Sequence, residues 1–138
     1  MNTNGHAGKR LNHAVIALVT SLVLLTSTEA RADILATGPV FGGNIQRSAV
    51  CYAFNTGAPI KILFGAIRNQ SGFIVPPTIN TCTGATLPQF GTCGISVGPL
   101  TIQAYECTFQ TQGTTADLRG VMDIRDTSGN VLINSNLR

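Results

Sequence analysis

The residue types that most often perform catalysis are scarce in this chain. Its two histidines, His6 and His13, both lie near the amino terminus, in a segment with the layout of a cleavable signal. Without them, the rest of the chain holds no Ser-His-Asp triad, no Cys-His pair and no histidine metal site. One lysine follows this segment, Lys61, between two isoleucines of an expected strand. An edge position with the ammonium group in solvent is favoured there over a Schiff base.

Carboxylates are the other side chains able to transfer protons. Those that could pair for glycoside hydrolysis are Asp117, Asp123, Asp126 and Glu106. In the stretch from 117 to 126, Asp123 lies four positions after Arg119 and two before Arg125. Because successive side chains of a strand point to opposite faces, an expected strand places these three on one face. A solvated face is the favoured interpretation, and Asp–Arg contacts on it contribute only about 0–1 kcal/mol.

The segment 126–130 (DTSGN) contains oxygen ligands of the kind that calcium prefers. It lacks the second acid and the distal glutamate of a calcium loop, however. A turn that begins at Asp126, with Gly129 at a positive φ, accounts for every residue of the segment. We therefore expect no metal site, no cofactor and no catalytic residue.

The four cysteines, Cys51, Cys82, Cys93 and Cys107, are the most informative residues of the chain. Their spacings of 31, 11 and 14 positions lack the close pairs from which zinc sites are built. An even number of cysteines behind an export signal predicts two disulfides, formed in an oxidising compartment.

We predict the pairing Cys51–Cys107 and Cys82–Cys93 among the three possible connectivities. The entropy of loop closure does not distinguish the connectivities. Closing loops of about 57 and 12 residues contributes about 4 and 3 kcal/mol, and the total for the rival pairing Cys51–Cys82 with Cys93–Cys107 is nearly equal. If Gly98-Pro99 is a two-residue hairpin loop, Cys93 lies opposite Ala104. Cys107 then faces the other side of the sheet, and a Cys93–Cys107 bond is excluded. A longer loop would shift this register.

Residues 1–32 have the three-part layout of a signal peptide. Lys9 and Arg10 precede an apolar run from Ala14 to Leu25, and a small-x-small site follows at residues 30–32. A twelve-residue helix reaches only about 18 Å, too short for a hydrocarbon core of about 30 Å. We expect cleavage after Ala32, with cleavage after Ala30 as the alternative.

Removal of the signal changes the charge of the protein. The nine basic residues fall to six and the six acidic residues to five, so a net charge of +3 becomes +1. So small a charge favours neither nucleic acid nor an anionic membrane as a partner. We also expect no membrane span in the mature form.

The elements that must position these residues are strands. From residue 45 onward, apolar residues recur with period two and turn clusters separate the runs, such as Asn55–Pro59 and Thr127–Asn130. About seven antiparallel strands are expected in residues 45–138, behind a loose lead-in at 33–44. This pattern predicts an all-β, two-sheet sandwich, with a small barrel as the alternative.

Two features favour an immunoglobulin-like outline for the sandwich. Cys51 and Cys107 lie 56 positions apart, each within an expected strand. Tyr105 precedes the second of these cysteines by two residues, as in a tyrosine corner. Two other features argue against homology with immunoglobulin domains. The chain has no tryptophan, and two expected strands follow Cys107 where an immunoglobulin domain has one.

The segments CYAFNTGAPIKI, LTIQAYEC and LRGVMDIRDTSGNVLINSNLR together resemble small exported proteobacterial proteins of uncharacterised function. The resemblance implies export and a β-rich fold, and it implies no activity at any residue.

We therefore expect an exported, non-enzymatic binding or structural module, periplasmic or secreted, with a protein or a glycan as its partner. The alternative is a small exported hydrolase that acts on polysaccharide through Asp117 and Asp123.

Overall fold

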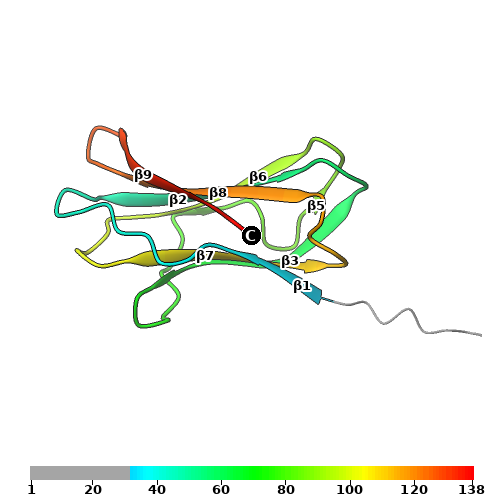
Figure 1. Cartoon of the computed structure of the whole chain (residues 1–138), viewed down its shortest axis with the longest axis horizontal. Coiled ribbons are helices and arrows are strands. Elements are labelled where there is room, and N and C mark those ends of the chain that lie inside the picture. The colour runs from blue at the N-terminus through cyan, green and yellow to red at the C-terminus, as the bar shows by residue number, and fades with distance from the viewer. Residues whose placement is uncertain (1–31) are drawn as a thin grey trace, which may run out of the picture.

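A computed structural model describes residues 32–138 as two antiparallel sheets packed face to face (Figure 1). The expected signal peptide lies outside the described residues, except for Ala32. The strands are β1 (Ala32–Ala36), β2 (Ser48–Asn55), β3 (Ile60–Asn69), β4 (Ile79–Asn80), β5 (Thr86–Leu87), β6 (Thr92–Val97), β7 (Tyr105–Gln112), β8 (Leu118–Arg125) and β9 (Val131–Asn136). The all-β sandwich is thus confirmed, and two of its strands, β4 and β5, are only two residues long.

Sheet A has the order β1-β7-β3-β5, and sheet B has the order β4-β6-β2-β8-β9. Alternation along each strand sends one set of side chains between the sheets and the other set to solvent. In β2, for example, Ala49, Cys51 and Ala53 are buried, whereas Tyr52 is exposed on the outer face. The core between the sheets includes Ile62, Ile95, Phe109, Met122 and Ile124.

The chain enters the sandwich earlier than expected. Residues 33–44 were predicted as a loose lead-in, but β1 pairs with β7 from Ala32 to Ala36. Ala36 also exchanges two backbone hydrogen bonds with Arg138, at 3.0 and 2.9 Å, so the carboxyl-terminal tail covers part of this sheet edge. The buried Leu35 explains the strand, because one inward apolar side chain is enough to hold a short edge against the core.

The predicted hairpin at Gly98-Pro99 is wrong. Strand β6 pairs with β2 and β4 in sheet B, and β7 pairs with β1 and β3 in sheet A, so the segment 98–104 crosses between the sheets. The buried Gln46 holds this segment, because its amide group donates to the carbonyls of Thr101 and Gln103 at 2.6 and 2.7 Å. Extended pairing from Leu100 onward is therefore replaced by a crossover.

The predicted disulfide pairing is confirmed, although the register argument for it fails. Cys51 of β2 and Cys107 of β7 join the two sheets across the core, with a Cα–Cα distance of 6.4 Å. Cys82 and Cys93 join the loop before β5 to β6, with a Cα–Cα distance of 5.0 Å. Cys93 and Cys107 are not joined to each other, because each is bonded to another cysteine.

Tyr105 forms the expected tyrosine corner. Its hydroxyl accepts a hydrogen bond from the Thr101 amide at 3.0 Å and contacts the Thr101 carbonyl at 3.2 Å. The bond fixes the end of the crossover at the point where β7 begins. Within residues 32–138, no helix is long and apolar enough to cross a bilayer.

Candidate functional site

The structure disperses the carboxylates that sequence reasoning considered for hydrolysis. Asp117 lies just before β8, and Asp123 lies near the other end of the same strand. The backbone from Leu118 to Asp123 alone spans about 16 Å, whereas the carboxyl pair of a glycosidase is separated by about 5 to 9.5 Å. Glu106 belongs to β7 in the other sheet. The hydrolase alternative therefore has no assembled carboxyl pair at Asp117 and Asp123.

Asp123 lies on the outer face of sheet B and forms an ion pair. Its Oδ2 atom is 2.9 Å from Nη2 of Arg125. The hydrogen bond that Arg125 donates to this carboxylate raises the pKa of Arg125, against the lowering effect of partial burial. The expected Asp–Arg contact is thus present for this pair, although the Asp123 side chain is only 14% exposed.

Asp126 closes the β8–β9 hairpin in the way its turn sequence predicts. Its Oδ1 atom accepts hydrogen bonds from the amides of Ser128 and Asn130 at 2.8 and 2.9 Å. Gly129 has a φ of +84°, which a residue with a Cβ atom rarely adopts. The turn itself engages these oxygen atoms, as expected for a structural role.

The Asp126 turn should make the domain sensitive to acid. The side-chain hydrogen bond from Asn130 lowers the pKa of Asp126 below its usual 3.8. A lowered folded-state pKa contributes stability above about pH 4, and this contribution is lost as the pH falls through the folded value. Between pH 7 and pH 3, the urea midpoint should fall further for the unmodified domain than for Asp126→Asn. Equal falls would contradict the role of the ionised carboxylate.

The remaining candidates show no convergence toward a metal or a nucleophile. Lys61 is exposed on sheet A, where it pairs with Thr86 of β5. Among residues 32–138, no group of three or more His, Cys, Asp or Glu side chains could hold a metal ion. All four cysteines are in disulfides, which indicates folding in an oxidising environment.

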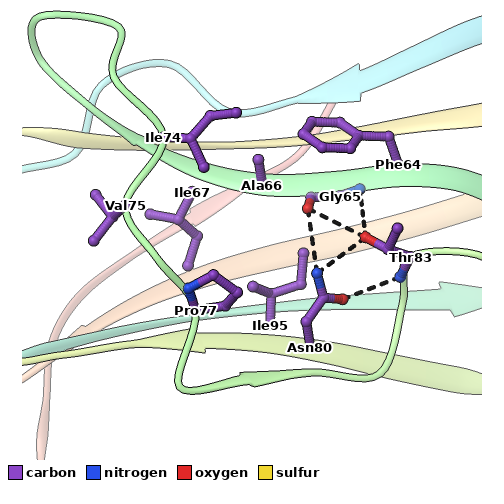
Figure 2. A pocket seen from close by; sticks show the side chains of 10 residues that line it. All are labelled: Phe64, Gly65, Ala66, Ile67, Ile74, Val75, Pro77, Asn80, Thr83 and Ile95. Atoms are coloured by element: carbon purple, nitrogen blue, oxygen red, sulfur yellow. Dashed lines mark hydrogen bonds between the residues drawn. The ribbon is translucent and has the colours of Figure 1, made fainter.

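A pocket that the sequence did not reveal lies along the open side of β3 (Figure 2). Its volume is about 230 Å³. The lining is mostly apolar and comprises Phe64, Gly65, Ala66, Ile67, Ile74, Val75, Pro77, Asn80, Thr83 and Ile95. An apolar concavity with a few polar groups is the usual form of a binding site.

The pocket exists because β3 has little backbone pairing on this side. Strand β5 pairs only with Ile60 and Lys61, and further along the strand Arg68 forms a single bridge with Ile74. The apolar run at residues 73–75 forms only that bridge. Pro76 and Pro77 follow it directly, and proline cannot donate to a strand ladder. This pair of prolines is the one sequence signal for the gap.

Between Lys61 and Arg68, where no strand pairs with the open side of β3, side chains form hydrogen bonds to it instead (Figure 2). The amide of Gly65 donates to Oγ1 of Thr83 at 3.1 Å, and Nδ2 of Asn80 donates to the same oxygen at 3.0 Å. The side-chain Oδ1 atom of Asn80 in turn accepts from the backbone amides of Cys82 and Thr83, each at 3.0 Å. This network closes the polar end of the pocket, and the rest of the pocket is apolar.

The rim of the pocket is also apolar and open to solvent. Ile74 lines the pocket and is 49% exposed, and Phe73, which precedes it in the chain, is 71% exposed. Contiguous exposed apolar side chains beside a concavity are typical of interaction sites. The arrangement offers shape and apolar contact to a ligand, and it offers no nucleophile or acid–base pair.

Gly65 should tolerate no side chain, because side chains of both sheets fill the space where its Cβ would lie. A Cβ atom there would meet Ile95 Cδ1 at 2.6 Å and Phe109 Cδ1 at 2.9 Å. We expect Gly65→Ala to lower the free energy of unfolding by about 2 kcal/mol through overpacking. The matched control is Gly94→Ala in β6, whose Cβ would lie 3.4 Å from Tyr52 Cδ1, and we expect its cost to be below about 0.5 kcal/mol. Similar urea midpoints for the two variants would contradict the prediction.

Comparison with models of known families, with curated proteins and with solved structures found no match to this chain.

Proposed function

We propose that this chain is an exported, non-enzymatic binding module whose pocket receives an apolar side chain of a partner protein. The observation that carries the proposal is the apolar pocket at the open side of β3, with Ile74 exposed at its rim. The pocket is large enough for one bulky side chain, and burying such a group contributes about 1.5–3 kcal/mol. The rigid sandwich, stapled across its core by Cys51–Cys107, holds the pocket in shape.

Export, to the periplasm or to the medium, is part of the proposal. It is supported by the signal layout of residues 1–32 and by the pairing of all four cysteines. We expect the exported form to begin at Asp33. Intact-mass measurement of the protein recovered from the periplasm or the medium tests this, and a start before residue 26 would refute the signal-peptide interpretation.

The binding function is tested by affinity capture with the tagged mature domain. The bait should capture a stoichiometric protein partner from periplasmic or culture fractions. Ile74→Asp should abolish the capture, because a carboxylate at the rim must be desolvated when the partner binds. The matched control is Ile45→Asp, since Ile45 is 61% exposed and does not line the pocket.

Two outcomes would overturn the proposal. One is the absence of any partner captured in a stoichiometric amount. The other is a partner that binds Ile74→Asp as well as it binds the unmodified domain. Circular dichroism of both variants confirms that the sandwich is folded, so that loss of capture is assigned to the pocket.

A further inference from the structure

Phe90 has a backbone conformation that its side chain does not favour. It lies in a turn closed by the Gly91 amide, which donates to the Pro88 carbonyl at 2.9 Å. Its φ is +61°, and among residues 32–138 no other non-glycine residue has a positive φ. Glycine would occupy this position without strain. A strained residue that persists in a structure suggests that its side chain is needed for something other than the turn.

Asn55 holds the turn rigidly in place. The Phe90 amide donates to the Asn55 carbonyl at 2.7 Å, and the Asn55 amide donates to the Gly91 carbonyl at 3.0 Å. The Phe90 ring nevertheless contributes little to the core, because the residue is 67% exposed. The fold therefore presents a fixed aromatic ring to solvent.

Phe90 is one of three aromatic rings on the outer face of sheet B, because Tyr52 and Phe54 alternate with the inward residues of β2 and the Phe90 ring stacks on Phe54. Its ring stacks on that of Phe54, with centroids 6.3 Å apart and an interplanar angle of 27°. Tyr52 follows on the same face of β2, about 6.6 Å along the strand. The Tyr52 ring lies beside Gly94 of β6, whose missing side chain leaves room for it. We call Tyr52, Phe54 and Phe90 the aromatic row.

Polar groups flank the aromatic row at fixed positions. Arg119 of β8 and Thr92 of β6 lie directly opposite Phe54, and both are exposed. The Asp123–Arg125 ion pair lies at the Tyr52 end, with Arg125 Nη2 3.5 Å from the Tyr52 hydroxyl. Because Asp123 and Arg125 neutralise each other, only Arg119 adds a net charge to this face. The face thus offers hydrogen-bonding groups beside its rings and little net charge, which suits a ligand rich in hydroxyl groups.

We propose that the aromatic row binds a neutral polysaccharide chain, in a site separate from the pocket. The C–H face of a sugar ring packs on an aromatic ring, and its hydroxyls hydrogen-bond to polar side chains at the ring edge. The flat outer face of a sheet suits an extended chain, since it has no walls that would limit the length of the ligand. The stacked Phe54–Phe90 pair, together with Tyr52 two residues along β2, gives the ligand two points of contact.

The test uses the folded mature domain and insoluble neutral polysaccharides, namely cellulose, chitin, an insoluble β-1,3-glucan and starch. We expect the unmodified domain to bind at least one of them in a pelleting assay. Phe90→Ala should weaken this binding about tenfold or more, as expected for an aromatic anchor. The matched control, Phe73→Ala, removes a ring of similar exposure (71%) at the pocket rim and should bind as the unmodified domain does.

Phe90→Gly separates a binding role of the ring from a folding role. It should lose polysaccharide binding as Phe90→Ala does, while its urea midpoint stays at or above that of the unmodified domain, because glycine relieves the strain at φ +61°. The proposal is overturned if the unmodified domain pellets with none of the four polysaccharides, or if Phe90→Ala binds normally. A marked loss of stability in Phe90→Gly would also overturn it, because the ring would then serve the fold.

Discussion

Cys51→Ala is expected to lower the free energy of unfolding by about 4 kcal/mol, and Cys82→Ala by about 3 kcal/mol. The Cys51–Cys107 bond closes a loop of 56 positions, whereas Cys82–Cys93 closes one of 11. A longer loop restricts the unfolded chain more, so its loss costs more. Cys51 is also fully buried between the two sheets, so its replacement leaves a free Cys107 thiol in the core.

Urea unfolding under non-reducing conditions measures both losses. The double variant Cys51→Ala/Cys107→Ala separates the loss of the bond from the effect of a free buried thiol. The matched double variant is Cys82→Ala/Cys93→Ala. If the Cys82 variants prove the less stable, the Cys51–Cys107 bond is not the principal staple of the sandwich.

Asn55→Ala is expected to lower the free energy of unfolding by about 3 kcal/mol, the cost of leaving buried polar groups unpaired. The Asn55 side chain is almost fully buried. Its Nδ2 atom donates to the carbonyls of Ala58 and Leu87 at 2.8 and 3.1 Å, and its Oδ1 atom accepts from the Gly57 amide at 3.0 Å. These bonds tie the β2–β3 turn to the loop that carries Phe90.

Asn80→Ala is the matched control for Asn55→Ala. Asn80 forms a similar set of turn bonds, to Cys82, Thr83 and Gly65, but it is exposed. Water can replace its bonds, so we expect a cost below about 1 kcal/mol in the same urea measurement. Equal losses at Asn55 and Asn80 would show that burial of the amide does not set the cost.

The two proposed sites use different parts of the sandwich. The pocket lies along the open side of β3, and the aromatic row lies on the outer face of sheet B. Phe73 and Phe90 are exposed aromatic residues of nearly equal accessibility, one near each site, so Phe73→Ala serves as the control for Phe90→Ala. A domain with both sites would link a protein to a polysaccharide, which is a structural role compatible with export.

The local features of the fold could be predicted from the sequence. The alternation from residue 45 onward predicted the all-β sandwich, and the turn at Asp126 has the hydrogen bonds that its residues imply. Period-two alternation and turn chemistry act over a few residues, so a single sequence contains them in full. Tyr105, two residues before Cys107, likewise indicated the tyrosine corner.

Pairing between distant strands required the tertiary structure. Alternation tells which face of a strand is buried, but not which strand lies beside it, and a segment such as 98–104 fits a hairpin loop as readily as a crossover. The placement of β6 and β7 in different sheets depends on contacts with β2 and β3 and on the amide of Gln46. Both candidate sites arise in the same way, because the pocket results from an incomplete edge of β3 and the aromatic row brings Phe90 onto Phe54. The sequence by itself thus determined strands, turns and the need for two disulfides, whereas long-range packing decided the sheets, the pocket and the aromatic row.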